Sequence, residues 1–90
     1  MPRPQPPLTT GLLADLEQKL QLKSNAEDIS QRQMVENAGL DWGNVQKVLR
    51  KGRQQQGDVS LGTISEIAQR LDIVLEFHGF IVGPVIRPQP

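Results

Sequence analysis

The sequence has few of the residues on which most enzyme and metal sites depend. It contains no cysteine, no tyrosine and a single histidine, His78, among its 90 residues. Without thiols there is no disulfide, no thiolate metal site and no cysteine nucleophile. One histidine cannot assemble a histidine metal cluster by itself, and no pair of acids is held at a common polar site. We therefore expect a protein that is not an enzyme and that carries no metal or cofactor.

Long apolar segments are missing as well. No stretch approaches the roughly 20 consecutive apolar residues that a membrane-spanning helix needs. The first ten residues, MPRPQPPLTT, lack the apolar core of a signal peptide. The absence of cysteine also fits a reducing compartment. The sequence therefore predicts a cytoplasmic protein with no membrane partner.

Net positive charge is concentrated in one segment in the middle of the chain. Ten lysines and arginines balance ten acids over the whole chain, yet residues 31–56 carry five cations and two acids, a net charge of +3. Residues 12–30 and 57–90 each carry a net charge of −2. A basic segment on an otherwise acidic body predicts a polyanionic partner such as nucleic acid.

The length of the chain and the positions of its prolines indicate one small domain between two proline-rich ends. Residues 1–9 hold four prolines, so they predict an extended, flexible arm, and residues 84–90 predict a flexible tail. The tetrapeptide RPQP occurs in both ends. Either this is a coincidence of composition, or Arg3 and Arg87 reach a phosphate or a minor groove.

Four helices are predicted between these ends. The first is expected from Thr10 to about Lys23, with Thr9 or Thr10 as its N-cap, before the turn-rich segment KSNAED. Its apolar residues fall on one helical face: Leu12, Leu13, Leu16 and Leu20. The fourth follows the polar loop GRQQQGD, is capped by Ser60 or Asp58, and spans LGTISEIAQRLD. Its predicted apolar stripe comprises Leu61, Ile64, Ile67, Ala68 and Leu71.

The second and third helices form a bent pair. Ser30 to Gln33 has the pattern of a capping box, in which the serine hydroxyl and the glutamine side chain each satisfy a backbone N–H. Gly39 is expected to end the second helix, because glycine adopts the left-handed conformation without penalty. Asp41 is the expected N-cap of the third helix, residues 42–51, which Gly52 is expected to end.

Two segments together resemble the helix-turn-helix of the Cro/phage-repressor (XRE-like) family. QRQMVENAGL at residues 31–40, followed by Val45 and Val48, is similar to that family's second helix, turn and recognition helix. SLGTISEIAQRLDI, at residues 60–73, is similar to the next helix. The resemblance covers about half of the chain. It implies a mainly α fold, a small lambda-repressor-like helical bundle, with residues 10–73 as a DNA-binding domain. Val35, Ala38, Gly43 and Gly52 depart from the usual pattern.

The resemblance, together with the polar face of the third helix, implies a set of DNA contacts. A recognition helix in the major groove presents donors to base edges. The expected base contacts are Asp41, Trp42, Gly43, Gln46 and Lys47. The expected phosphate contacts are Gln31, Arg32, Arg50, Lys51 and Arg53. Two alternatives stay open: Trp42 could pack into the core, and the basic cluster at residues 50–53 could be a solvated helix end.

The last apolar segment, IVLEFHGFIV, predicts a short C-terminal β-strand or hairpin within residues 74–83. A single strand would leave an unpaired edge, so we favour pairing with a second copy of the chain. Some dimeric members of the family that the motif resembles also dimerise through such a strand. The expected dimerisation residues are Val74, Leu75, Phe77 and Phe80. The alternative is a hairpin within one chain through Gly79, or a strand packed on its own core.

The function expected from these features is sequence-specific binding of double-stranded DNA by a homodimeric transcriptional repressor that recognises a palindromic operator. A chain with proline-rich ends and a C-terminal strand could also dock on another protein. The alternative hypothesis is therefore an antitoxin that binds a toxin protein and represses its own operon.

Overall fold

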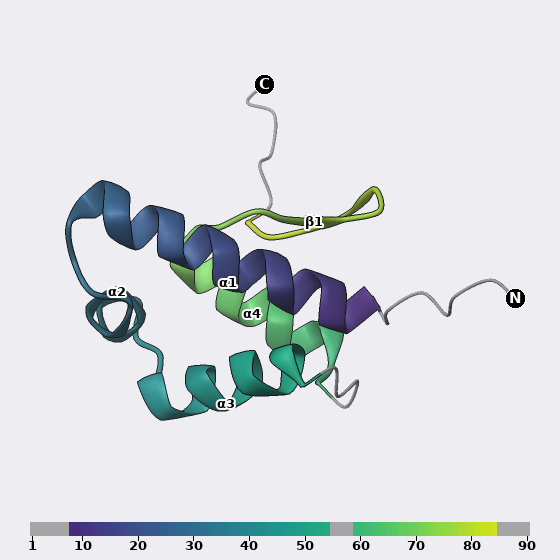
Figure 1. Ribbon diagram of the computed structural model, residues 1–90, viewed down its shortest axis with the longest axis horizontal. Coiled ribbons are helices and arrows are strands. Elements are labelled where there is room, and N and C mark those ends of the chain that lie inside the picture. Colours follow the sequence, from purple (N-terminus) through teal and green to yellow (C-terminus); the bar gives the residue numbers. More distant parts are fainter. Residues whose placement is uncertain (1–7, 55–58, 85–90) are drawn as a thin grey trace, which may run out of the picture.

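The computed structural model describes residues 8–54 and 59–84, which form four helices followed by a two-stranded β-hairpin (Figure 1). The helices are α1 (Leu8–Glu27), α2 (Gln31–Asn37), α3 (Trp42–Arg53) and α4 (Leu61–Leu71), and the strands are β1 (Leu75–Phe77) and β2 (Phe80–Val82). This confirms the predicted fold class, a small and mainly helical bundle with a short C-terminal β element. Arg3, Arg87 and Asp58 lie outside the described residues.

Helix α1 is the element around which the others pack. It contacts α2, α3, α4 and β1, and Figure 1 shows the hairpin and α3 on opposite sides of it. Four of its leucines are at most 1% exposed: Leu12, Leu13, Leu16 and Leu20. Burying one leucine side chain stabilises the fold by roughly 1.5–3 kcal/mol. The predicted apolar face of this helix is therefore confirmed as the centre of the core.

The length predicted for α1 was wrong at both ends. The helix begins at Leu8, so residues 8 and 9 belong to it and not to an arm, and it continues through the predicted breaker segment to Glu27. A tertiary contact and a local one hold the extra turn: Lys23 Nζ donates to the Leu71 carbonyl at 2.7 Å, and the buried Ser24 hydroxyl donates to the Ile29 carbonyl. Such contacts override the weak helix preference of serine and asparagine.

Helices α1, α2 and α4 end with the same backbone motif. A residue with positive φ follows each helix, and the next N–H donates to the carbonyl five residues earlier. The positive-φ residues are Asp28 (+55°), Gly39 (+79°) and Asp72 (+57°). The bonds are Ile29 to Ser24 at 3.2 Å, Leu40 to Val35 at 3.1 Å and Ile73 to Ala68 at 2.9 Å. Each helix therefore stops sharply and turns an apolar residue toward the core.

Gly52 does not end α3, in contrast to the prediction. The helix runs through Gly52 to Arg53, and Gly52 is buried against α1. A Cβ atom built on Gly52 would lie 2.6 Å from Leu13 Cβ, closer than real Cβ contacts allow. Glycine is needed there because α3 approaches α1 closely.

Most of the apolar stripe predicted for α4 is buried, as expected. Ser60 is its N-cap, since its hydroxyl accepts a hydrogen bond from the Thr63 N–H at 3.1 Å. The buried members of the stripe are Ile64, Ile67, Ala68 and Leu71. Leu61 was wrongly predicted as a core residue: it is the first residue of the helix, at the margin of the core, and it is 38% exposed.

The C-terminal segment is a hairpin within one chain. Strands β1 and β2 pair antiparallel, with Leu75 opposite Val82, Glu76 opposite Ile81 and Phe77 opposite Phe80. The two turn residues, His78 and Gly79, both have positive φ, as a two-residue type I′ turn requires. The favoured prediction assumed a single strand without a partner in its own chain. That assumption is wrong, because β1 pairs with β2.

The four predicted dimerisation residues have different environments in the hairpin. Leu75 is fully buried in the chain's own core, so it is not available to a second copy. Phe77 is half-buried and its ring lies against Gly11 of α1. Val74 and Phe80 are exposed by 43% and 44%. Only the last two offer apolar surface to a partner.

Across the described residues, no helix combines the length and the apolar character needed to cross a membrane. Within the same ranges, no group of three or more histidine, aspartate or glutamate side chains is placed to hold a metal ion.

Candidate nucleic-acid interface

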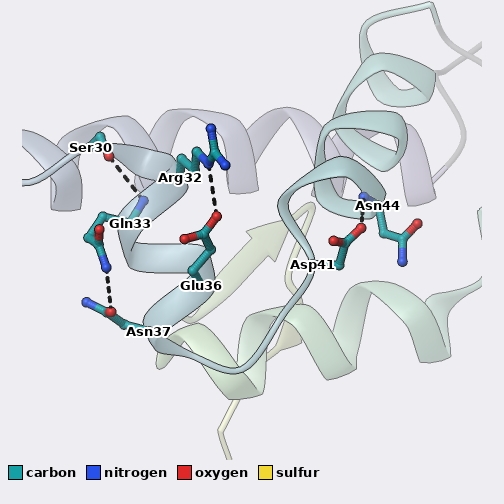
Figure 2. A network of polar contacts seen from close by, with 7 residues as sticks. All are labelled: Ser30, Arg32, Gln33, Glu36, Asn37, Asp41 and Asn44. Atoms are coloured by element: carbon teal, nitrogen blue, oxygen red, sulfur yellow. Dashed lines mark hydrogen bonds and ion pairs between the residues drawn. The ribbon is translucent and has the colours of Figure 1, made fainter.

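The sequence at the start of α2 fixes where the helix begins. The Ser30 hydroxyl accepts a hydrogen bond from the Gln33 N–H at 3.1 Å, as an N-cap does (Figure 2). The predicted capping box forms only halfway, because the Gln33 amide donates to Asn37 Oδ1 at 2.8 Å instead of returning to the Ser30 backbone. The serine cap therefore sets the start of the helix without its expected reciprocal bond.

The bend between α2 and α3 depends on Gly39 and Asp41. Gly39 has φ of +79°, so α2 ends here and the chain turns, as predicted. Asp41 then caps α3, since its Oδ2 accepts a hydrogen bond from the Asn44 N–H at 3.0 Å (Figure 2). These two local features, both predicted from the sequence, fix the direction in which α3 leaves the turn.

The glycine in this turn yields a direct stability prediction. Gly39→Ala is expected to lower the free energy of unfolding by about 1–2 kcal/mol, because an L-residue with a Cβ is strained at positive φ. The effect should be one of backbone strain alone, since the nearest atom to the added Cβ is Arg70 Nη1 at 3.6 Å. Urea denaturation of both proteins measures it. Unchanged stability would show that the turn can adopt another conformation.

Helix α3 has one buried and one exposed face. Val45 and Leu49 are 2% and 5% exposed and lie on the same side as Gly52, while Trp42 and Val48 are half-buried beside them. The residues exposed on this helix are Gly43, Asn44, Gln46, Lys47, Arg50 and Arg53. The predicted base contacts Gln46 and Lys47 are therefore open to solvent and free of the core.

The charge of α3 differs in sign from that of the remaining chain. The helix carries four cations and no acid, in a chain whose ten cations balance ten acids, so the other residues together carry a net charge of −4. In the described part of the chain, neither Lys47 nor Arg50 pairs with an acid. Arg53 Nη1 lies 3.4 Å from Glu17 Oε1 of α1, and Lys51 is half-buried. Lys47 and Arg50 are thus the cations of this helix best placed to meet a polyanion.

Two of the predicted base contacts already have roles within the protein. Trp42 packs against the core cluster, so the structure favours the core alternative that the sequence left open. The carboxylate of Asp41 is used in the helix cap. A base contact by either residue stays a prediction, whereas their structural roles are visible.

The predicted phosphate contacts on α2 also have partners. Gln31 is half-buried, and its Nε2 donates to Gln21 Oε1 of α1 at 2.6 Å. Arg32 Nε lies 2.9 Å from Glu36 Oε1 (Figure 2). The hydrogen bond that Arg32 donates to Glu36, and then the charge of that carboxylate, raise the pKa of the exposed Arg32 guanidinium. Arg32 therefore remains a cation on an open surface, whereas Gln31 mainly ties α2 to α1.

A cleft of about 470 Å³ lies between α3 and the start of α4, beside the exposed face of α3. It is lined by Asn44, Lys47, Val48, Lys51, Val59, Ser60 and Thr63. Asn44, Ser60 and Thr63 were not predicted as site residues. The spacing of Asn44, three residues before Lys47 on the same helix, could have identified it. Ser60 and Thr63 gave no such signal, because their pattern predicts only the start of a helix.

Comparison of the chain with protein-family models, with curated proteins and with solved structures gave no match. The resemblance of residues 30–73 to the Cro/phage-repressor family therefore stays an interpretation of the motif. The exposed surface of α3 is the feature of the molecule that bears on its function.

Proposed function

We propose that the protein is a sequence-specific DNA-binding transcriptional regulator that inserts α3 into the major groove. The observation that carries this proposal is the exposed face of α3, where Gln46, Lys47 and Arg50 project from a helix anchored by Val45 and Leu49. The major groove of B-DNA is wide enough for an α-helix, and each base pair there presents a distinct pattern of donors and acceptors. A rigid helix with free polar side chains is suited to read that pattern.

The base-reading residues of this interface are Gln46 and Lys47, with Asn44 beside them. A glutamine or asparagine amide can bond adenine N6 and N7 together, and a lysine ammonium can donate to guanine O6 and N7. All three side chains are exposed within the first half of α3. A preference for particular base pairs would therefore come from this half of the helix.

Affinity without sequence preference would come from the cations that follow. Arg50 is exposed with no ion pair to any described acid, and Lys51 lines the cleft between α3 and α4. Contacts to phosphates release counterions and position the protein without reading sequence. Because the residues outside α3 carry a net charge of −4, the field of the molecule also orients α3 toward DNA.

The regulator is proposed to act as a homodimeric repressor on a palindromic operator. Two copies of α3 would then occupy half-sites about 34 Å apart, one turn of B-DNA, or a multiple of that distance. Occlusion of RNA polymerase from the operator is the simplest mechanism open to a helical domain of this size.

Selection of bound duplexes from a random pool tests the proposal directly and should return a consensus sequence. On that consensus, Gln46→Ala and Lys47→Ala are each expected to cost about 1–3 kcal/mol in binding at one base pair. Competition with single-base variants of the consensus should show that each substitution relaxes preference at its own position. A pool that yields no consensus at low salt would refute the proposal.

Arg50→Ala should behave differently from these two variants. It is expected to weaken binding to every duplex by a similar factor and to reduce the slope of log affinity against log salt by about 1. Gln18→Ala, which removes an exposed side chain of α1, is the matched control and should change neither property. If Arg50→Ala changed the preferred sequence, or Lys47→Ala left it unaltered, the division between base and phosphate contacts would be wrong.

A further inference from the structure

The two edges of the β-hairpin differ in how their backbone groups are satisfied. On the β1 side, the Glu76 N–H donates to Asp15 Oδ2 at 2.8 Å, and Lys19 Nζ donates to the Val74 carbonyl at 2.6 Å. Asp15 and Lys19 belong to α1 and form an ion pair of 2.9 Å with each other. Side chains of α1 therefore close the outer edge of β1 against pairing with another strand.

The outer edge of β2 is open. In a hairpin with a two-residue turn, Phe77 and Phe80 form the hydrogen-bonded pair that closes the turn, so the next pair, Glu76 and Ile81, points its backbone groups outward. The bond from the Glu76 N–H to Asp15 agrees with this geometry. The N–H and C=O of Ile81 therefore face away from β1, and no described residue bonds them.

The β2 side of this edge is apolar, with Glu76 of β1 as the exposed charged neighbour of Ile81. Ile81 is 66% exposed, Phe80 44% and Leu61 38%, and a cleft of about 390 Å³ lies between α4 and β2. Residues 79–84 contain no charged side chain. Edge strands of soluble proteins are usually protected by charges, prolines or a covering element. The open β2 edge, with its apolar flanks, is thus the part of the hairpin suited to pair with another strand.

We infer that a second copy of the chain pairs with β2, antiparallel, about a two-fold axis at Ile81. A second copy fits because the segment Gly79-Phe80-Ile81-Val82-Gly83 has one apolar residue and then a glycine on each side of Ile81, so it is suited to pair with itself antiparallel. A two-fold axis there sets Ile81 opposite its own copy and Phe80 opposite Val82 of the other chain, with glycines at both ends. The two Ile81 residues then exchange both backbone hydrogen bonds, which completes a four-stranded sheet.

This inference rests on the hairpin alone and does not require that the proposed DNA binding be correct. It also changes which residues form the dimer. Val74, Leu75 and Phe77 of the sequence prediction are replaced by Ile81 and the β2 backbone, while Phe80 is retained.

Cross-linking through a single introduced thiol tests the predicted register. The chain has no cysteine, so Ile81→Cys provides one thiol per copy. Opposite residues in a hydrogen-bonded antiparallel pair have Cα atoms about 5.5 Å apart, within the range of about 4.4–6.8 Å for a disulfide. Mild oxidation should therefore convert most of the Ile81→Cys protein to a covalent dimer on a non-reducing gel.

Glu76→Cys is the matched control, since Glu76 is the exposed cross-strand neighbour of Ile81. In the proposed sheet the two Glu76 positions are separated by three strand spacings of about 4.8 Å each, too far for a disulfide. We expect at least a tenfold slower cross-link for Glu76→Cys. Equal rates for the two variants, or no cross-link for Ile81→Cys, would overturn the inference.

The oligomeric state in solution supplies an independent readout. Sedimentation equilibrium over a range of concentrations should show a monomer–dimer equilibrium, and Ile81→Lys should weaken it at least tenfold by placing two cations at the axis. Leu22→Lys, at an α1 leucine that is 60% exposed, should leave it unchanged. A wild-type monomer at every concentration, or a dimer unaffected by Ile81→Lys, would contradict the proposal. If circular dichroism showed Ile81→Lys to be unfolded, the comparison of the cross-linking rates of Ile81→Cys and Glu76→Cys would test the dimer instead.

Discussion

Replacement of Leu16 by alanine is expected to lower the free energy of unfolding by about 2–5 kcal/mol. Leu16 is fully buried in the middle of α1, the helix that contacts each of the other three helices and β1. The loss combines the transfer free energy of the removed methyl groups with the cavity that a close-packed core cannot fully refill. Because small domains are stable by only about 5–15 kcal/mol, this single change is expected to unfold a substantial fraction of the protein under mild denaturant.

Urea denaturation followed by circular dichroism measures the change, and the same helix provides its control. Leu22→Ala makes the same chemical substitution at a side chain that is 60% exposed, and it should shift stability by no more than about 0.5 kcal/mol. Similar losses for the two variants would mean that the measured effect reports helix propensity and not the packing of α1 in the core.

Gly52→Val should lower the free energy of unfolding by about 3 kcal/mol, near the upper end of the usual cost of overpacking. An added Cβ atom would lie 2.6 Å from Leu13 Cβ, and that atom cannot move without the α1 backbone. Alanine at the same position should cost less, since its better helix propensity offsets about 1 kcal/mol of the strain. The stability order is therefore expected to be glycine, alanine, valine.

Gly62→Ala separates this steric effect from the general effect of removing a glycine. Gly62 is an exposed residue of α4 whose nearest neighbour to an added Cβ is Ser60 Oγ at 3.9 Å. Its substitution is expected to leave stability unchanged or to raise it by up to about 1 kcal/mol. Thermal unfolding of the three Gly52 and Gly62 variants is a sufficient measurement. A stabilised Gly52→Val protein would show that the α1–α3 contact is looser than described.

Features governed by neighbouring residues were predictable from the sequence. The caps at Ser30, Asp41 and Ser60 and the left-handed glycine at residue 39 depend on local hydrogen bonding and backbone sterics, and the structure has all four. The exposure of Gln46 and Lys47 also followed from local pattern. Once Val45 and Leu49 define the buried face of a helix, Gln46 and Lys47, one and two positions after Val45, must point away from the core.

Features that depend on distant residues were missed. The role of Gly52 is set by Leu13 of α1, and the last turn of α1 is held in part by the Leu71 carbonyl, so neither could be read from local sequence. The hairpin is a local feature that the sequence left open as an alternative, because His78-Gly79 is a weaker turn signal than asparagine-glycine or aspartate-glycine. The cleft residues Ser60 and Thr63 were missed because only the fold brings them beside α3.

The packing of α1 has a geometric consequence. Its Asp15 and Lys19 hold the edge of β1, and its Leu13 meets α3 at Gly52, with no flexible segment between these attachments. A dimer built on β2 would therefore separate its two copies of α3 by a length that a single rigid rod determines. Operators with an altered number of base pairs between half-sites would then bind the dimer less tightly. This selectivity would come from the length of α1 and not from any residue that contacts a base.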